Sequence, residues 1–445
     1  MLKRLFTLIL LFGLLLNSGF AQINAPRPCG NPDAYKNSKI KEYSAGGKYF
    51  ESWFSKIEKE ESARMATDEE TIYTIPVVVH VLHNGEPEGE GKNLSFERVQ
   101  SQIEILNNDF GKLPGTPGFN TNPVGVDTRI RFCLATTDPN GQPTNGVVRI
   151  NTQRDGFDFN TDNGVLKGFS FWDPEKYLNI WTVKLNGNQY IGYAQYPFIQ
   201  PQWSDSLPFP QPVPDVQPDG VVAEYRVFGN VPAGQSGPFP SYNKGRTITH
   251  EIGHYLGLLH IWGDAGGCSD PLNTDYCDDT PKQANYTSGC PANVNSCTSG
   301  VLAMKENYLD YTNDACMNIF TADQKKRMRI VMRNCVRRKT LLLNTNICQV
   351  TTDTQIIPDP DEIKDLRFYY KYTKVSSDTI NIRLPDSTTV KSINVFDFIG
   401  RPIAILGLVE DNHVIMYINK MKAGVYVSRI EASDGRVWVR KFMKE

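Results

Sequence analysis

Runs of apolar and polar positions divide the chain into segments of different character. The stretch from residue 71 to 83 is an almost continuous series of apolar and β-branched residues, which predicts a buried strand. Similar runs, each predicting a further strand, lie at 128–136, 178–185 and 220–229.

Helical spacing marks three other segments. Between residues 94 and 113, apolar side chains recur three and four positions apart, and Gly111 is the predicted C-cap. A second helix is predicted around Thr247, and a third follows Thr321, its candidate N-cap. Helices and strands together predict an α/β (α+β) domain built on a mixed sheet.

The N-terminus carries Lys3 and Arg4 and then runs apolar to Leu16, with small residues up to Ala21. This pattern predicts a signal peptide over residues 1–21. The alternative is a membrane anchor, but the apolar run is shorter than the roughly 20 residues that span a bilayer. We therefore expect an exported mature chain without a membrane span.

The rest of the chain divides into four parts. Residues 22–70 are polar and weakly periodic, which predicts a solvated, partly disordered arm suited to processing. Residues 71–350 form the α/β domain, and the polar, proline-stiffened stretch 351–364 is a linker. Short alternating segments over 365–445 predict a small all-β sandwich.

Composition sets further limits. The 445 residues are enough for two or three domains, and the net charge of −2 favours neither a nucleic-acid partner nor an anionic membrane. Export favours disulfides. The chain has nine cysteines, so at least one thiol is left for another role.

Three of the six histidines lie within eleven residues. His250 and His254 are four positions apart, so a helix places both imidazoles on one face. Gly257 then lets the chain turn and bring His260 back as a third nitrogen ligand. Three protein ligands leave an open fourth position, typical of catalytic zinc, and Glu251 can carry a proton from the attacking water to the leaving amine.

This pattern resembles the zinc signature of the metzincin clan of endopeptidases. Within the clan, the similarity extends to the pappalysin family. It is carried by stretches spread over residues 73–335, among them "IPVVVHVLHN", "YLNIWTV", "GYAQYP", "DDTP" and "NYLDYTNDACMNIFT". The resemblance implies a two-part, metzincin-type catalytic domain with zinc in a cleft, acting on protein or peptide substrates.

Metzincins carry a methionine turn beneath the zinc, and some families place an oxyanion-stabilising tyrosine two residues further on. Tyr311 matches that tyrosine, whereas Leu309 stands at the methionine position. Because leucine and methionine have similar volumes, the resemblance still implies an apolar base under the site.

The resemblance also implies two disulfides, Cys268–Cys297 and Cys290–Cys316. The alternative is a second zinc site, but the long and uneven spacings favour cross-links. A pairing of Cys335 with Cys348 is a further expectation, while Cys133 and Cys277 are left unassigned.

The loop "CSDPLNTDYCDDTP" contains four acidic residues, Asp270, Asp275, Asp278 and Asp279. Clustered carboxylates and carbonyls suit calcium, and the resemblance implies structural Ca2+ near this loop. The alternative is a solvated acidic loop, and the ligating oxygens are left open.

Cys29 lies in "APRPCGNPD", just after the predicted signal peptide. A Cys-Gly pair beside an arginine resembles a cysteine switch, in which a propeptide thiolate occupies the open zinc position. The alternative is a disulfide with a cysteine such as Cys133. With a switch, activation requires a cut in the arm that ends near residue 70, and Arg64 is a candidate position.

Bacterial pappalysins tend to cleave before arginine or lysine, so the resemblance implies a carboxylate in the pocket for that side chain. Asp314 is the nearest candidate, and Asp310 is the alternative. Residues 220–228 are expected to form the edge strand that pairs with an extended substrate.

The C-terminal stretches "INVFDFIGRPIAIL" and "INKMKAGVYVSRIEASDGRVWVRKFMKE" resemble the sorting domain of the type IX secretion system. That resemblance implies the type IX machinery as a partner and passage through the periplasm to the cell surface or beyond. The alternative is a carbohydrate- or protein-binding sandwich.

The sequence thus predicts a secreted zinc endopeptidase made as a zymogen. Two alternatives stay open. One is a non-catalytic surface-binding protein on the same scaffold, which Leu309 favours and Glu251 opposes. The other is a metal amidase that acts on cell-wall peptides.

Overall fold

The computed structural model describes residues 29–31, 33, 41–199, 219–264, 266–343 and 347–348, and most of the chain from 373 to 444. The predicted signal peptide and the linker 351–364 lie outside these residues. The chain divides into two compact units, residues 1–140 with 146–349, and residues 141–145 with 350–445.

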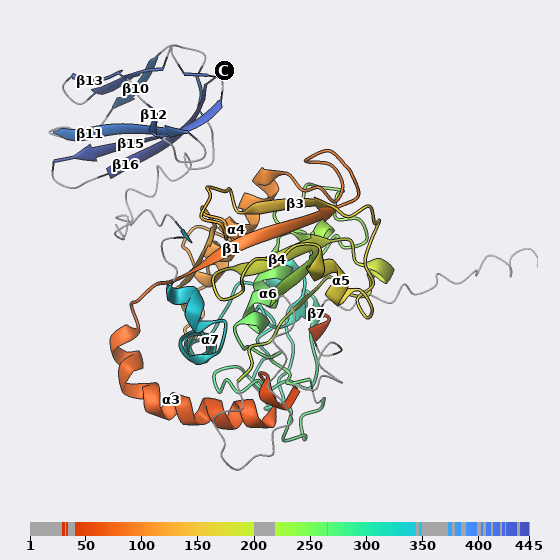
Figure 1. The fold of residues 1–445 in the computed structure, drawn as a ribbon. Coiled ribbons are helices and arrows are strands. Elements are labelled where there is room, and N and C mark those ends of the chain that lie inside the picture. Colours follow the sequence, from red (N-terminus) through yellow and green to blue (C-terminus); the bar gives the residue numbers. More distant parts are fainter. Residues whose placement is uncertain are drawn as a thin grey trace, which may run out of the picture. The chain divides into compact units, whose positions relative to one another are not determined.

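A mixed sheet of six strands forms the frame of the first unit (Figure 1). Its strands are β1 (Tyr73–His83), β2 (Ile130–Leu134), β3 (Val147–Asn151), β4 (Leu178–Val183), β5 (Gly192–Ala194) and β6 (Gly220–Glu224). The two halves of β1 pair in parallel with β2 and β3 along one side, and β4 pairs along the other. β6 continues the parallel arrangement, and β5 runs antiparallel at the edge.

The expectation that residues 220–228 form the edge strand is wrong. β6 lies inside the sheet between β4 and β5, and all five of its residues are buried. The edge position on this side of the sheet belongs instead to the three-residue strand β5. Its short Gly-Tyr-Ala sequence is too brief to show a strand pattern.

Helices cover both faces of this sheet. They are α4 (Phe96–Phe110), α5 (Asn163–Gly168), α6 (Arg246–Tyr255) and α7 (Ala322–Asn334). Val99 of α4 and Ile252 of α6 share one core with Val79 of β1, whereas Leu166 of α5 packs with Trp181 on the opposite face. The predicted ends of these helices are confirmed, because α4 ends at Gly111 and a capping box at Thr321 begins α7.

Helix α3 (Lys48–Asp68) contradicts the expectation of a partly disordered arm. Its docked side chains recur at helical spacing, and they are Phe50, Trp53, Phe54 and Ile57. They pack with Ile330 and Val331 of α7, which lies beside α3 in Figure 1. Tertiary docking, more than intrinsic propensity, therefore stabilises this segment as a helix.

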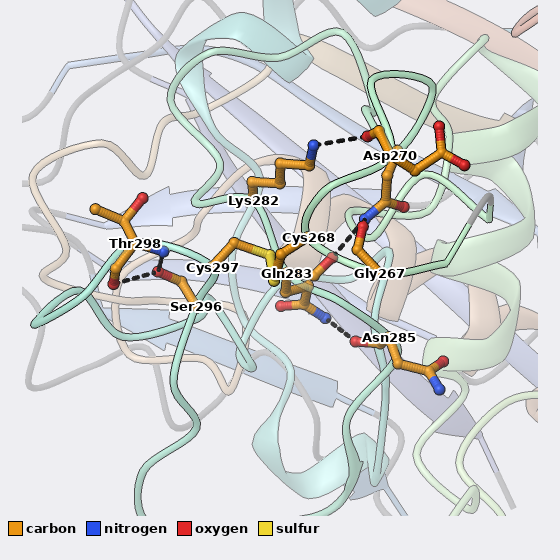
Figure 2. The surroundings of a disulfide bond; sticks show 10 residues. Gly267, Cys268, Asp270, Lys282, Gln283, Asn285, Ser296, Cys297 and Thr298 are labelled. Carbon is orange, nitrogen blue, oxygen red and sulfur yellow. Dashed lines mark hydrogen bonds between the residues drawn. A yellow bond between two sulfur atoms is a disulfide. The ribbon is translucent and has the colours of Figure 1, made fainter.

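Disulfides stabilise the loops that follow α6. The structure joins Cys268 to Cys297 and Cys290 to Cys316, as the resemblance implies. Around the first bond, Lys282 donates through Nζ to the carbonyl of Asp270 at 2.8 Å (Figure 2). These links hold a region with very little regular secondary structure.

The expected Cys335–Cys348 pair is wrong. Cys348 is bonded to Cys133 of β2, and this link closes a sequence separation of 215 residues. Cys29, Cys277 and Cys335 are free and buried among the described cysteines. Cys335 is the C-cap residue of α7 and belongs to the apolar cluster into which α3 packs. Its side chain therefore contributes to the packing of this cluster and forms no disulfide.

The regular secondary structure in the described part of the second unit consists of strands. They are β9 (Thr373–Val375), β10 (Thr379–Arg383), β11 (Val390–Asp397), β12 (Pro402–Ile403), β13 (Leu406–Glu410), β14 (His413–Tyr417), β15 (Gly424–Ala432) and β16 (Val437–Lys444). One sheet has the order β12-β11-β15-β16-β9, and the other has the order β10-β14-β13. Val395 of β11 and Val414 of β14 share one apolar cluster.

Short elements complete the structure. Two-residue strands β7 (Ser288–Gly289) and β8 (Tyr311–Thr312) pair in parallel. The 3-10 helices in the described part of the chain are Lys41–Tyr43, Asn186–Asn188, Tyr225–Val227, Asp314–Cys316 and Lys339–Leu343. Within the described residues, no helix combines the length and the apolar character needed to cross a membrane.

Candidate metal centre and active site

Helix α6 carries the first half of the site. Every residue from Arg246 to Tyr255 is buried, so His250 and His254 project from a helix enclosed by protein. The helix ends at Gly257, whose φ of 93° is a left-handed conformation that favours glycine. A Cβ at this position would also approach Cγ2 of Val331 to 2.9 Å. The chain therefore turns here and returns His260 to the helix, as predicted.

The three imidazoles converge through their Nε2 atoms. Nε2 of His254 lies 3.0 Å from that of His250 and 3.1 Å from that of His260, and the third separation is 3.3 Å. Three nitrogens bonded to one tetrahedral zinc ion lie about 3.3 Å apart, given bonds of about 2.0 Å. The residues present therefore fit a zinc ion.

The other ring nitrogens have acceptors that fix the tautomer. Nδ1 of His250 donates to the carbonyl of Tyr308 at 2.7 Å, and Nδ1 of His254 donates to that of Leu258 at 2.9 Å. Burial and the neighbouring imidazoles lower the pKa of His250 to about 3 and that of His254 well below its usual value. The rings of His250 and His254 are therefore neutral, with Nε2 lone pairs free for a metal.

Cys29 completes the cluster. Its Sγ and one nitrogen from each histidine all lie within 4.8 Å of one another, the one potential metal-binding group found among the described residues. Cys29 is buried, and its Sγ is 3.7 Å from Oε2 of Glu251. The structure thus places the Cys29 thiol beside the three histidines and the glutamate.

The residues next to Cys29 lie along the sheet edge. Gly30 donates its backbone N–H to the carbonyl of Gly192 at 2.9 Å, and Oδ1 of Asn31 accepts from the backbone N–H of Ala194 at 2.7 Å. Cys29 pairs with Gly192 in the parallel direction. The segment therefore occupies hydrogen-bonding groups of β5 that would otherwise be open to another extended chain.

Glu251 has no exposed surface. Burial raises its pKa well above the usual value, and its Oε1 has no hydrogen-bond partner among the described residues. Gly192 of β5 is pressed against it, because a Cβ there would lie 2.9 Å from Cγ of Glu251. The carboxylate is thus held between the histidines and the edge strand.

Tyr311 lies over the histidines from strand β8. Its ring centroid is 4.9 Å from that of His260 and 5.7 Å from that of His250. Burial raises the pKa of the Tyr311 hydroxyl well above its usual value, so this group remains a hydrogen-bond donor.

Leu309, at the methionine position, is fully buried in the core beneath the site. A Cβ on Gly253 of α6 would lie 2.9 Å from Cδ2 of Leu309, so the leucine side chain packs directly against α6. The apolar base expected under the site is present. Leucine therefore supplies a buried apolar side chain at the methionine position.

A small cavity of about 20 Å³ adjoins His250, with Asp310, Asp314 and Met317 in its lining. Oδ2 of Asp314 accepts from the backbone N–H groups of Lys244 and Arg246, whereas its Oδ1 has no partner among the described residues. The carboxylate of Asp310 instead accepts from Thr287, Tyr311 and Gln283 through both oxygens. Of the two candidates, Asp314 is the one with a free oxygen.

Two contacts of the site were not predicted. Asp264 accepts from Nδ1 of His260, and the hydroxyl of Tyr196 lies 3.3 Å from Nδ1 of His254. The four-residue spacing from His260 to Asp264 was a usable signal, although no helix continues there. Arg64, the proposed cleavage position, falls inside α3, where its side chain is not described.

Comparison with known proteins agrees with this geometry. Residues 237–333 match the peptidase family described as pregnancy-associated plasma protein-A, and residues 376–445 match the secretion system C-terminal sorting domain. An extracellular metalloprotease of Arthroderma otae is 29% identical over 255 residues, which are 57% of this chain and 76% of that protein.

Two solved structures from Tannerella forsythia are also similar. Mature mirolysin in complex with a cleaved peptide shares 36% identity with a TM-score of 0.52, covering 62% of this chain and 98% of that one. A promirolysin mutant shares 32% identity with a TM-score of 0.55, covering 72% and 98%. The chain belongs to the pappalysin family of metzincin zinc metallopeptidases.

More particularly, the protein is a secreted or cell-surface zinc metalloendopeptidase made as a zymogen, and it carries a type IX sorting tail.

Proposed function

We propose that His250, His254 and His260 hold the catalytic zinc of this endopeptidase. The observation that carries the proposal is the convergence of three Nε2 atoms within 3.3 Å of one another beside a buried glutamate. A zinc ion held there supplies the Lewis acidity that peptide hydrolysis requires.

The chain's own residues supply the proton transfer and the hydrogen bonds. Glu251 takes a proton from the attacking water and delivers it to the leaving amine. Tyr311 donates a hydrogen bond to the oxyanion of the tetrahedral intermediate, a role supported by its protonated hydroxyl and its position over the histidines.

Latency is proposed to come from residues 22–70, acting as a propeptide after removal of the signal peptide 1–21. Cys29 occupies the position that the attacking water needs, and Gly30 and Asn31 cover the edge of β5. Supporting this, the promirolysin mutant covers a larger share of the chain than mature mirolysin does. Because Arg64 lies within α3, cleavage there requires local opening of the helix.

Cleavage before arginine or lysine is proposed to depend on Asp314. Asp314 lines the cavity beside His250, and its Oδ1 has no hydrogen-bond partner among the described residues, so it could form a charge-assisted hydrogen bond with a basic side chain.

The domain boundaries that we propose are a catalytic domain over residues 71–350, a linker over 351–364 and a sorting domain over 365–445.

Calcium binding by the acidic loop is a further part of the proposal. Oδ1 of Asp279 is buried without a partner among the described residues, while Asp275 is already bonded to Thr280 and to the backbone N–H of Cys277. Added Ca2+ should raise the melting temperature of the wild type and have less effect on Asp279→Asn. An equal response in both would exclude Asp279 as a ligand.

The experiment that tests the proposal compares four preparations of the full chain: wild type, Cys29→Ser, the double variant Cys29→Ser/Glu251→Gln, and Cys29→Ser with a chelator. Peptide products are identified by mass spectrometry. We expect Cys29→Ser to cleave peptides without prior processing, and the double variant to be slower than Cys29→Ser by about 100-fold or more while retaining zinc. Equal activity of Cys29→Ser and the double variant would refute the proposed general base.

A further inference from the structure

The turn after the third histidine has an unusual backbone. Gly263 and Asp264 both have left-handed conformations, with φ of 72° and 59°. At Gly263 this is enforced by close packing, because a Cβ there would lie 2.7 Å from the carbonyl carbon of Asn273. The backbone of Asp264 is in a conformation that residues with a side chain rarely adopt, although aspartate tolerates it better than most.

This backbone aims the Asp264 carboxylate back at the site. Its two oxygens lie 2.8 and 2.9 Å from Nδ1 of His260. The backbone N–H of Gly263 donates to the carbonyl of His260 at 2.8 Å, and Trp262 stacks on the imidazole with ring planes only 8° apart. His260 is therefore fixed through its ring face, its Nδ1 and its backbone.

The three histidines differ in what their Nδ1 atoms meet. His250 and His254 donate to neutral backbone carbonyls, whereas His260 donates to a carboxylate. Asp264 has no lysine or arginine partner among the ion pairs of the described residues. Its ion-pair partner among the described residues is the imidazole of His260, and a third of its side chain surface is exposed.

We infer that Asp264 is the positioning residue of the zinc site: it orients His260 and strengthens that ring as a metal donor. A carboxylate that accepts from the second nitrogen of a zinc-bound imidazole fixes its tautomer and increases electron donation to the metal. This inference rests on the zinc ligands proposed above. The competing explanation is that Asp264 only forms the turn.

Three substitutions separate these explanations. Asp264→Gly suits the left-handed backbone but removes the acceptor, Asp264→Asn keeps an acceptor without the charge, and Asp264→Ala loses both. Gln153→Gly is the matched control, because Gln153 is exposed and has a similar φ of 55° away from the histidines. His260→Ala tests the ligand itself.

The measurement is Zn2+ affinity of the full chain, by competition with a chromophoric chelator, together with the visible spectrum of the Co2+-substituted protein. We expect Asp264→Gly and Asp264→Ala to bind Zn2+ about 10–100-fold more weakly and to shift the Co2+ bands. Asp264→Asn should lose less, and the metal-free melting temperature of Asp264→Gly should stay at or above that of wild type. Gln153→Gly should bind as wild type does.

Wild-type Zn2+ affinity in Asp264→Gly, with a clear loss in His260→Ala, would overturn the inference while leaving the ligand set intact. Wild-type affinity in His260→Ala would instead refute the ligand set on which the inference rests. A loss of affinity in Asp264→Gly that is matched by a lower metal-free melting temperature would assign Asp264 to the turn alone, and would also overturn it.

Discussion

Arg327 of α7 and Glu51 of α3 form a two-point ion pair, with Nη1–Oε2 and Nη2–Oε1 distances of 2.9 and 2.6 Å. Through Nε, Arg327 also donates to the carbonyl of Gly257 at 2.7 Å. One guanidinium therefore ties α3 to the turn between His254 and His260.

Glu51→Ala should loosen α3. The substitution leaves Arg327, whose side chain is 1% exposed, without its carboxylate, at a cost of about 3 kcal/mol. In an inactive Glu251→Gln background, limited tryptic cleavage within α3 should accelerate by roughly 100-fold. Glu60→Ala is the control, because Glu60 is half exposed and 3.9 Å from Lys56, and it should change the rate little. Equal rates in the two variants would contradict the prediction.

Tyr311→Phe should lower kcat by about 100-fold and change KM little, because an oxyanion donor acts mainly in the transition state. The ring packing against Trp262 and Tyr286 is retained in phenylalanine. Steady-state kinetics of the activated enzyme test this expectation. A raised KM with unchanged kcat would show that the hydroxyl binds substrate instead.

The preference for a basic residue after the cut should depend on pH. Burial raises the pKa of Asp314 to about 6, so the carboxylate is ionised at pH 7 and largely protonated at pH 5. The ratio of kcat/KM for two peptides that differ only by arginine or methionine after the cut should therefore fall as pH falls. In Asp314→Asn the ratio should be about 10–100-fold lower at pH 7 and independent of pH. A pH-dependent ratio in this variant would exclude Asp314.

Two of the disulfides close loops of very different length, so their removal should lower the free energy of unfolding by different amounts. Cys133–Cys348 spans 215 residues and Cys268–Cys297 spans 29. In the chain-entropy description, loss of the longer link costs about 2 kcal/mol more. Denaturant unfolding of the two double-alanine variants measures the difference. A greater loss for the shorter link would show that local strain or loop packing outweighs chain entropy.

The three proposed zinc ligands could be predicted because all of them lie within eleven residues. Only helix geometry and one glycine turn are needed to bring His250, His254 and His260 together. The main strands and helices were predicted for the same reason, since each depends on a local apolar pattern. Strand order is different: β6 has a stronger strand sequence than β5, yet β5 is the edge.

The other features that were predicted wrongly depend on contacts between residues far apart in the sequence. Helix α3 carries the apolar spacing of a helix from Phe50 to Ile57, but its many charged residues obscured the pattern. Its carboxylates find basic partners more than 260 positions away, in α7. Likewise, the partner of Cys348 depends on where β2 lies in the sheet, which sequence spacing does not encode.

The hydrogen bond from His250 to the carbonyl of Tyr308, fifty-eight positions further along the chain, links metal binding to the folding of the domain. The three ligands can meet within one short peptide, but the acceptor that orients the first arrives only when the chain around Tyr308 has folded against α6. Metal affinity and folding are then thermodynamically linked, so each tenfold gain in zinc binding adds about 1.4 kcal/mol to the folded state. The zinc supply of the compartment in which the chain matures thereby becomes a determinant of its conformational stability.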